Sequence, residues 1–148
     1  MLDNDLLSSE VLVGEPVRDI LIVDDEPFNR KILAYHLRSR KGIRLHTATN
    51  GEEALDVLRS LLPGAEEVIV LLDLDMPVMD GYDFLRIWNI EKKRYFGKQV
   101  SIILVTASDP DVVMERGLDP NKYGFVQKPI IFSHLNRLLL AHFEFKLQ

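Results

Sequence analysis

Short apolar runs alternate with longer segments of helical spacing along this sequence, and that alternation limits the fold more than any other feature. Four short segments are apolar enough for buried strands, and a fifth alternates apolar with polar side chains. The five segments are residues 20–23, 43–48, 68–72, 100–105 and 123–127. Strands that alternate with helices through short connections form a parallel sheet with right-handed crossovers. The sequence therefore predicts an α/β fold.

A helix is expected after each of these strands. The expected helices cover about residues 27–40, 51–62, 81–96, 111–116 and 131 onwards, the second of them closed by Pro63 and Gly64. Asn50 and Glu53 form a reasonable cap for the second of them. The alternating segment, residues 43–48, has one wet face and belongs at a sheet edge. We therefore expect a five-stranded parallel sheet of order 2-1-3-4-5 with helices on both faces, a flavodoxin-like doubly wound fold.

Apolar spacing also predicts which face of three of these helices is apolar. The predicted faces are Phe28, Ile32 and Tyr35 in the first helix, Phe84, Leu85 and Trp88 in the third, and Ile131, Leu135, Leu138 and His142 in the last.

Composition indicates an ordinary globular protein and excludes several other classes. The chain has 148 residues, of which 47% are hydrophobic, and a net charge of -5, so neither nucleic acid nor a membrane is expected as a direct partner. No apolar run approaches the ~20 residues of a membrane span. Asp3 and Asp5 stand where an export signal would be basic. The chain has no cysteine, which excludes disulfides and suits a reducing compartment, so we expect a cytoplasmic protein.

Residues 1–18 are predicted to be an N-terminal extension, and residues 19–148 the domain itself. The extension mixes Leu6, Leu7 and the apolar residues 11–13 with serine, glycine and proline. Such a segment packs on its own domain or stays disordered, or else covers a partner surface. The sequence leaves these alternatives open.

Polar side chains stand at the carboxyl ends of four expected strands. They are Asp24 and Asp25, Asp73, Thr106 and Lys128. Because parallel strands end at one edge of the sheet, we expect these groups to lie together. Clustered carboxylates without His or Cys suit a hard cation such as Mg²⁺, and a lysine and a hydroxyl suit a phosphate. The set predicts a phosphoryl-transfer site in which an aspartate is the nucleophile.

Four motifs in this order resemble those of the receiver domain of two-component response regulators. They are ILIVDDEP, LLDLDMPVMDG, VTAS and FVQKP, and the likeness covers roughly residues 18–141. The resemblance implies that Asp73 accepts the phosphoryl group. It assigns Mg²⁺ binding to Asp25 directly, to Asp24 mostly through water and to the backbone carbonyl of Asp75. It also implies a switch in which Thr106 moves toward the phosphoryl group, beside Lys128, and Phe125 turns inward, and a Lys128–Pro129 bond that is often cis.

The resemblance further implies a Mg²⁺-dependent signalling switch that catalyses only its own phosphorylation and dephosphorylation. Its expected partners are a histidine kinase or histidine phosphotransfer protein and a downstream protein that binds the face formed by residues 110–141. Residues 115–121 and a short fourth helix depart from the family pattern, which puts the family's usual dimerisation and output face in doubt but not the phosphorylation site. A homodimer stays an open alternative. We also predict that the Asp75 carboxylate changes the dephosphorylation rate.

Two other functions compete with this prediction. The LLDLDMP segment also resembles the DxD motif of haloacid dehalogenase-type phosphatases, although its position in the chain and the order of the acidic residues do not fit them. A receiver that no longer accepts phosphate and serves only for docking is the second alternative. The complete set of Asp24, Asp25, Asp73, Thr106 and Lys128 argues against it.

Overall fold

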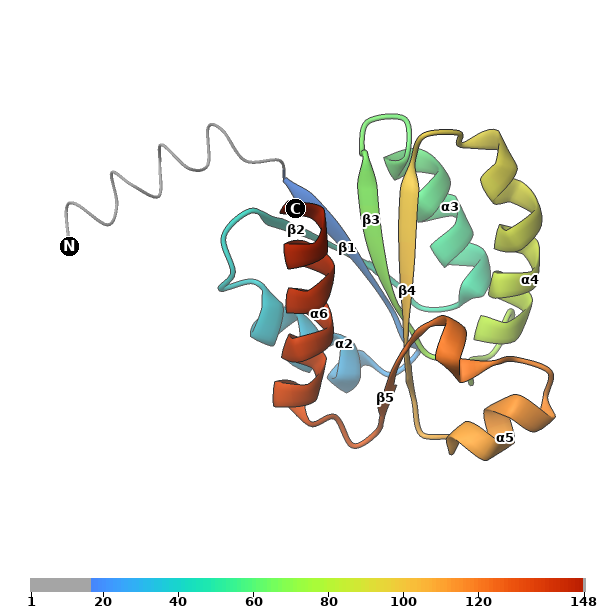
Figure 1. Cartoon of the computed structure of the whole chain (residues 1–148). Coiled ribbons are helices and arrows are strands. Elements are labelled where there is room, and N and C mark those ends of the chain that lie inside the picture. The colour runs from blue at the N-terminus through green and yellow to red at the C-terminus, as the bar shows by residue number, and fades with distance from the viewer. Residues whose placement is uncertain (1–16, 148) are drawn as a thin grey trace.

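The computed structural model describes residues 17–147, which form a parallel sheet between two layers of helices (Figure 1). The strands are β1 (Arg18–Val23), β2 (Ile43–Ala48), β3 (Glu67–Leu72), β4 (Gln99–Thr106) and β5 (Gly124–Gln127). The helices are α2 (Pro27–Leu37), α3 (Gly51–Leu61), α4 (Gly81–Glu91), α5 (Pro110–Glu115) and α6 (Phe132–Leu147), with short 3₁₀ turns η1 (Lys92–Arg94) and η2 (Pro120–Lys122). The predicted fold class and the strand order β2-β1-β3-β4-β5 are confirmed. Most of the predicted N-terminal extension, residues 1–16, lies outside the described residues.

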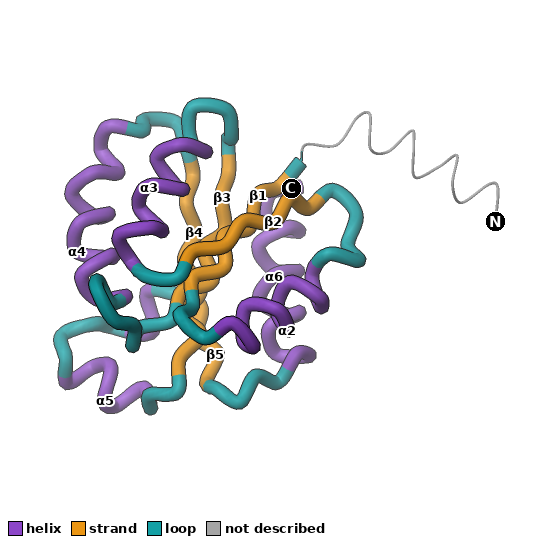
Figure 2. Tube along the Cα trace, turned by 180° about the vertical axis from the view of Figure 1, so that it is seen from behind, coloured by secondary structure: helices purple, strands orange, loops and turns teal. Residues whose placement is uncertain are grey.

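Two hydrophobic clusters hold the helices to the sheet, one on each face. Leu21 and Val23 of β1 point into the cluster under α3 and α4, while Ile20 and Ile22 point into the cluster under α2 and α6. Figure 2 shows the same two layers from behind. Because the central strands bury both faces, they are apolar almost throughout, whereas the edge strand β2 alternates.

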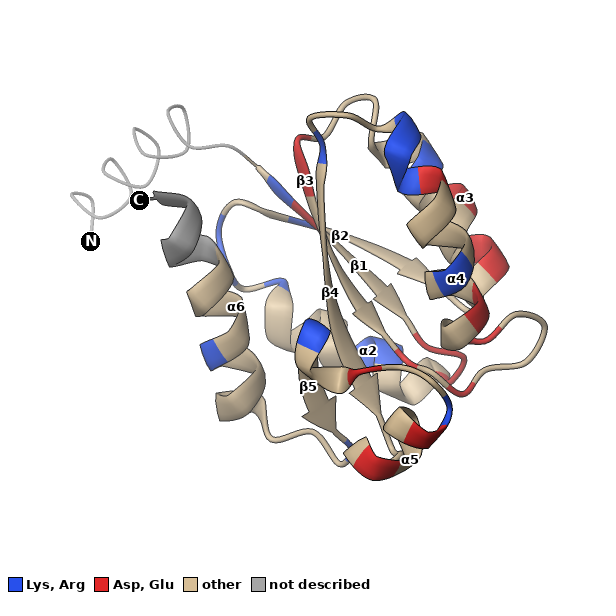
Figure 3. Cartoon of the chain, turned by 45° about the vertical axis from the view of Figure 1, so that its right-hand side comes forward, with Lys and Arg blue, Asp and Glu red and all other residues tan. Residues whose placement is uncertain are grey.

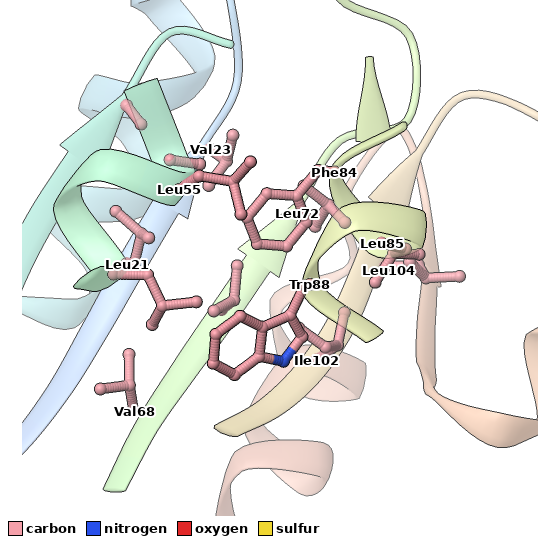
Figure 4. Packing of buried hydrophobic residues seen from close by; sticks show 14 of the residues in the cluster. Leu21, Val23, Leu55, Val68, Leu72, Phe84, Leu85, Trp88, Ile102 and Leu104 are labelled. Atoms are coloured by element: carbon pink, nitrogen blue, oxygen red, sulfur yellow. The ribbon is translucent and has the colours of Figure 1, made fainter. Parts of the chain in front are cut away.

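The cluster under α3 and α4 confirms the apolar face predicted for residues 81–96. Phe84, Leu85 and Trp88 are all buried, and Figure 4 shows them packed against Leu72 and Leu104 of the neighbouring strands. Local capping supports the same layer, since Asn50 Oδ1 accepts the Glu53 N–H at 2.8 Å, as predicted.

The apolar residues predicted to share one face of α2, Phe28, Ile32 and Tyr35, do lie on one side of the helix, but that side is turned away from the core. Phe28 and Tyr35 are 70% and 72% exposed, and the buried residues of this helix are Leu33 and Leu37. The helix carries apolar side chains on two sides, so spacing alone offers two candidate faces, and only its orientation on the sheet selects one. In the last helix Leu135 is buried as predicted, whereas Ile131, which precedes α6, is 67% exposed.

Two helices end earlier than predicted. The segment expected to be helical to residue 96 leaves α-helical geometry after Glu91, where η1 takes over, and Gly97 follows with a φ of 83°. The first helix ends at Leu37, five residues before Gly42, whose φ is 77°. These left-handed glycines turn the chain back toward the sheet. Within residues 17–147 no helix is long and apolar enough to cross a membrane.

Candidate functional site

The carboxyl ends of β1 and β3 bring three aspartates together. Asp24 and Asp73 are buried, with 2% and 6% of their surface exposed, and Asp25 beside them is half-buried. One carboxylate oxygen from each lies within 4.8 Å of the others. In Figure 3 the red loops that follow β1 and β3 mark this acidic edge. The two strands are hydrogen-bonded neighbours, with Val23 paired to Leu72, so the residues that follow them must meet.

Lys128 reaches the same point from the end of β5. Its Nζ donates to Asp24 Oδ2 at 2.7 Å and to Asp73 Oδ2 at 3.3 Å. Its backbone N–H donates to Thr106 O at 2.8 Å, which fixes the chain beside β4. Burial by itself would lower the pKa of Lys128, but the bond to Asp24 and the charges of Asp73 and Asp24 outweigh it, so the pKa lies above its ordinary value. The lysine therefore stays protonated.

Asp73 is the most perturbed acid of the site. Its pKa rises to about 6, chiefly because burial removes water from the carboxylate. The charge of Asp24 raises it further, while Lys128 and the N–H of Asp75, 3.3 Å from Asp73 Oδ1, act in the opposite direction. The fold therefore holds a carboxylate in a poorly solvated place and supplies one cation beside it.

Thr106 and Phe125 lie on the two neighbouring strands beyond β3. Thr106 is fully buried, and its Oγ1 accepts the Ser108 N–H at 3.2 Å. Phe125 of β5 is half-buried and packs against the cluster under α3 and α4. The Lys128–Pro129 peptide bond is cis, as the resemblance implied.

The Asp75 side chain contacts Ser108 and Arg116 and not the three clustered aspartates. Its Oδ2 accepts the Ser108 hydroxyl at 3.2 Å, and its Oδ1 lies 3.7 Å from Arg116 Nη1. The carboxylate is therefore at the rim of the site, while its N–H faces Asp73.

Two cations at the site were not predicted from the sequence. Arg30 donates from Nη1 to the backbone oxygen of Asp24 at 2.8 Å, and Arg116 lies over the Tyr82 ring at 4.0 Å. Arg116 belongs to residues 115–121, which depart from the family pattern. Neither arginine stands at a strand end, and strand ends were the signal that identified the other site residues.

Gly81 is a third residue whose role was missed. A Cβ at this position would lie 2.5 Å from the backbone oxygen of Asp73 and 2.8 Å from Leu74 Cα. Only glycine allows α4 to start this close to the end of β3. Its place at the end of the motif LLDLDMPVMDG was the available signal.

A family model, several relatives and several solved structures match this chain. The model described as "Response regulator receiver domain" matches residues 20–140, which is most of the chain. This chain belongs to the receiver domain family of two-component response regulators. The motif resemblance is thereby confirmed, and the phosphatase alternative loses its support.

The sensor histidine kinase RcsC of Salmonella typhi is 33% identical to this receiver over 149 residues, 97% of this chain. The receiver spans only 15% of the length of RcsC. Among solved structures, the response regulator TrrA of Thermotoga maritima, in complex with Mg²⁺ and BeF, is 31% identical with a TM-score of 0.64, covering 84% of this chain and 97% of TrrA. A receiver domain of an HD domain-containing protein from Pseudomonas fluorescens has a TM-score of 0.67 at 23% identity, covering 86% of this chain and 94% of that one, and so shows the fold alone.

Proposed function

We propose that this receiver accepts a phosphoryl group on Asp73 and changes its partner surface in response. The observation that carries the proposal is the meeting of Asp24, Asp25 and Asp73 within 4.8 Å, with the Lys128 ammonium on two of them. A buried acid at a strand end, flanked by further acids and one fixed cation, fits phosphoryl transfer better than it fits a structural ion pair.

The three carboxylates suit Mg²⁺, because it prefers oxygen ligands and the cluster contains no His or Cys. Asp24, Asp25, Asp73 and the backbone carbonyl of Asp75 would hold it. When bound, Mg²⁺ offsets the charge that gathers on the transferring oxygens. Lys128 supplies a second positive charge from the protein itself.

The transfer is a simple exchange of bonds at phosphorus. A carboxylate oxygen of Asp73 forms the new P–O bond, the P–N bond of a donor phosphohistidine breaks, and its electron pair stays on the imidazole, which takes a proton from water. The signal ends by hydrolysis. Water attacks the phosphorus, the P–O bond to Asp73 breaks with its electron pair returning to the carboxylate, and inorganic phosphate leaves. The receiver thus promotes only its own phosphorylation and dephosphorylation.

The switch follows from the charge added at Asp73. The new phosphate oxygens attract the Thr106 hydroxyl and the Lys128 ammonium. Movement of Thr106, which is fully buried, vacates space into which the half-buried Phe125 ring turns. A local charge change thereby biases the surface formed by residues 110–141.

The expected donor is a histidine kinase or a histidine phosphotransfer protein, and the output is contact with a downstream protein. Two of the relatives, a sensor histidine kinase and a response regulator in complex with Mg²⁺ and BeF, support this assignment. Direct binding of nucleic acid or a membrane is not part of the proposal.

The test is phosphorylation with acetyl phosphate and Mg²⁺, followed by intact-mass analysis. Wild type and Asp111→Asn, which changes an exposed carboxylate in α5, should gain the mass of one phosphoryl group. Asp73→Asn should gain none, and EDTA should prevent the gain in all three proteins. An unmodified wild type would overturn the proposal in favour of the docking-only receiver, and a modified Asp73→Asn would assign a different acceptor.

A further inference from the structure

An apolar groove runs along the outer side of α2, next to α6. It has a volume of about 640 Å³, and its lining includes Phe28, Lys31, Ile32, Tyr35, Arg38 and Phe132. We define these residues as the α2 groove. The groove has a fixed floor, because His36 stacks on Phe132 with 4.3 Å between ring centres and its Nε2 lies 2.7 Å from Asn136 Oδ1 of α6.

The apolar residues of the α2 groove do not belong to the hydrophobic core. Leu33 and Leu37 already fill the sheet side of α2, yet Phe28 and Tyr35 stand 70% and 72% exposed on the other side. Several large side chains of this kind on one helix face, rimmed by cations, are typical of a surface that another segment covers.

The charges around the groove indicate an acidic occupant. Lys31 and Arg38 line the groove, and no aspartate or glutamate does. Two further cations of the same segment are engaged elsewhere, Arg30 with the backbone oxygen of Asp24 and Arg40 with Asn136 Oδ1.

Residues 1–16 have the complementary composition. They contain Asp3, Asp5, Glu10 and Glu15 with no lysine or arginine, and their apolar residues include Leu6, Leu7 and residues 11–13. We propose that residues 1–16 of this chain pack onto the α2 groove, with these apolar side chains against Phe28 and Tyr35 and the acids beside Lys31 and Arg38. The proposal is independent of phosphorylation at Asp73.

The attachment point of the segment allows this path. The Arg18 N–H donates to Gly42 O at 2.8 Å, so residues 1–16 join the described chain beside the loop that follows α2. The 11 residues of α2 span about 16 Å, whereas 16 extended residues reach about 53 Å. The segment can therefore run the full length of the groove.

A second copy of the chain is a poorer occupant. Joining two α2 grooves would bring Lys31 and Arg38 of one chain against the same two cations of the other, and like charges at that range repel. An anionic membrane would fit the cations of the groove but must also approach a molecule with a net charge of -5.

Paramagnetic NMR tests the proposal on the full chain. Since the sequence has no cysteine, Ser9→Cys places a single nitroxide in the segment. Ser60→Cys, an exposed serine on α3 on the opposite face of the sheet, is the matched control. We expect the Ser9 label to reduce amide signals of α2 at least twofold and the Ser60 label to leave them unchanged. Adding Tyr35→Glu to Ser9→Cys should restore the signals while the remaining spectrum stays folded.

Three results would overturn the proposal. In the first, the Ser9 label leaves the α2 amides unchanged. In the second, the signals fall only when spin-labelled chain is mixed with ¹⁵N-labelled chain that has no nitroxide, which assigns the groove to a second copy. In the third, the α2 amides change only on addition of phosphatidylserine vesicles, which assigns it to a membrane surface.

Discussion

Replacing the proposed acceptor, Asp73→Asn, should stabilise the metal-free receiver near neutral pH. The fold raises the pKa of Asp73 from 3.8 to about 6, chiefly through burial, so the folded state binds this proton more tightly than the unfolded chain does. Between about pH 4 and about pH 6 Asp73 is ionised in the unfolded chain but still protonated in the folded protein, so the free energy of unfolding of wild type falls as the pH rises through this range. The side chain of Asp73→Asn does not ionise, so the variant does not lose this stability.

The size of the effect follows from the two pKa values. A pKa of about 6 against 3.8 corresponds to about 3 kcal/mol for ionising Asp73 in the folded state. Water at the rim of the pocket screens part of this penalty, and the uncharged asparagine side chain of the variant loses the attraction of Lys128, 3.3 Å away. We expect Asp73→Asn to raise the free energy of unfolding by about 1–3 kcal/mol at about pH 7.5.

Urea unfolding in EDTA, at about pH 7.5 and about pH 4, measures this difference. The gain from Asp73→Asn should be present at the higher pH and nearly absent at the lower one. Asp75→Asn, which changes a carboxylate that is 55% exposed, should shift stability by no more than about 0.5 kcal/mol. Added Mg²⁺ should stabilise wild type more than Asp73→Asn, because only wild type keeps the full ligand set. An asparagine variant that is less stable than wild type at the higher pH would refute the reasoning.

Three further outcomes are expected. Leu33→Ala should lower the free energy of unfolding by about 2–5 kcal/mol, whereas Tyr35→Ala on the exposed side of the same helix loses only the Arg38 contact and the proposed contact with residues 1–16 and should cost no more than about 1 kcal/mol; equal effects in urea unfolding would contradict the assigned core face. Gly81→Ala should cost about 1–3 kcal/mol because the new Cβ meets backbone, while Gly64→Ala, whose nearest neighbour is 4.0 Å away, should be close to neutral in the same assay. Asp75→Asn should change the lifetime of the phosphoryl group at least twofold when dephosphorylation is followed by intact mass. An unchanged lifetime would contradict the prediction that the Asp75 carboxylate influences the dephosphorylation rate.

Much of the site was predictable because a parallel sheet gathers its strand ends. Once residues 20–23 and 68–72 are identified as neighbouring strands, Asp24 and Asp73 must meet at one edge, and the pairing of Val23 with Leu72 confirms that they do. The same argument places Lys128 near them. Arg30 and Arg116 were not predictable in this way, because each arrives through the rotation of a helix or the path of a loop.

Strand and helix placement along the chain and the position of the acidic edge follow from the order of apolar and polar residues, because period and chain direction are local properties. The strand order agrees with that pattern, but only the pairing of the strands in the sheet determines it. The side of α2 that faces the sheet does not follow from them. Leu33 and Phe28 are comparably apolar, and only packing against β1 and its neighbours buries the first and leaves the second exposed. The perturbed pKa of Asp73 also arises from the assembled fold, since burial and the neighbouring charges act only after distant segments have come together.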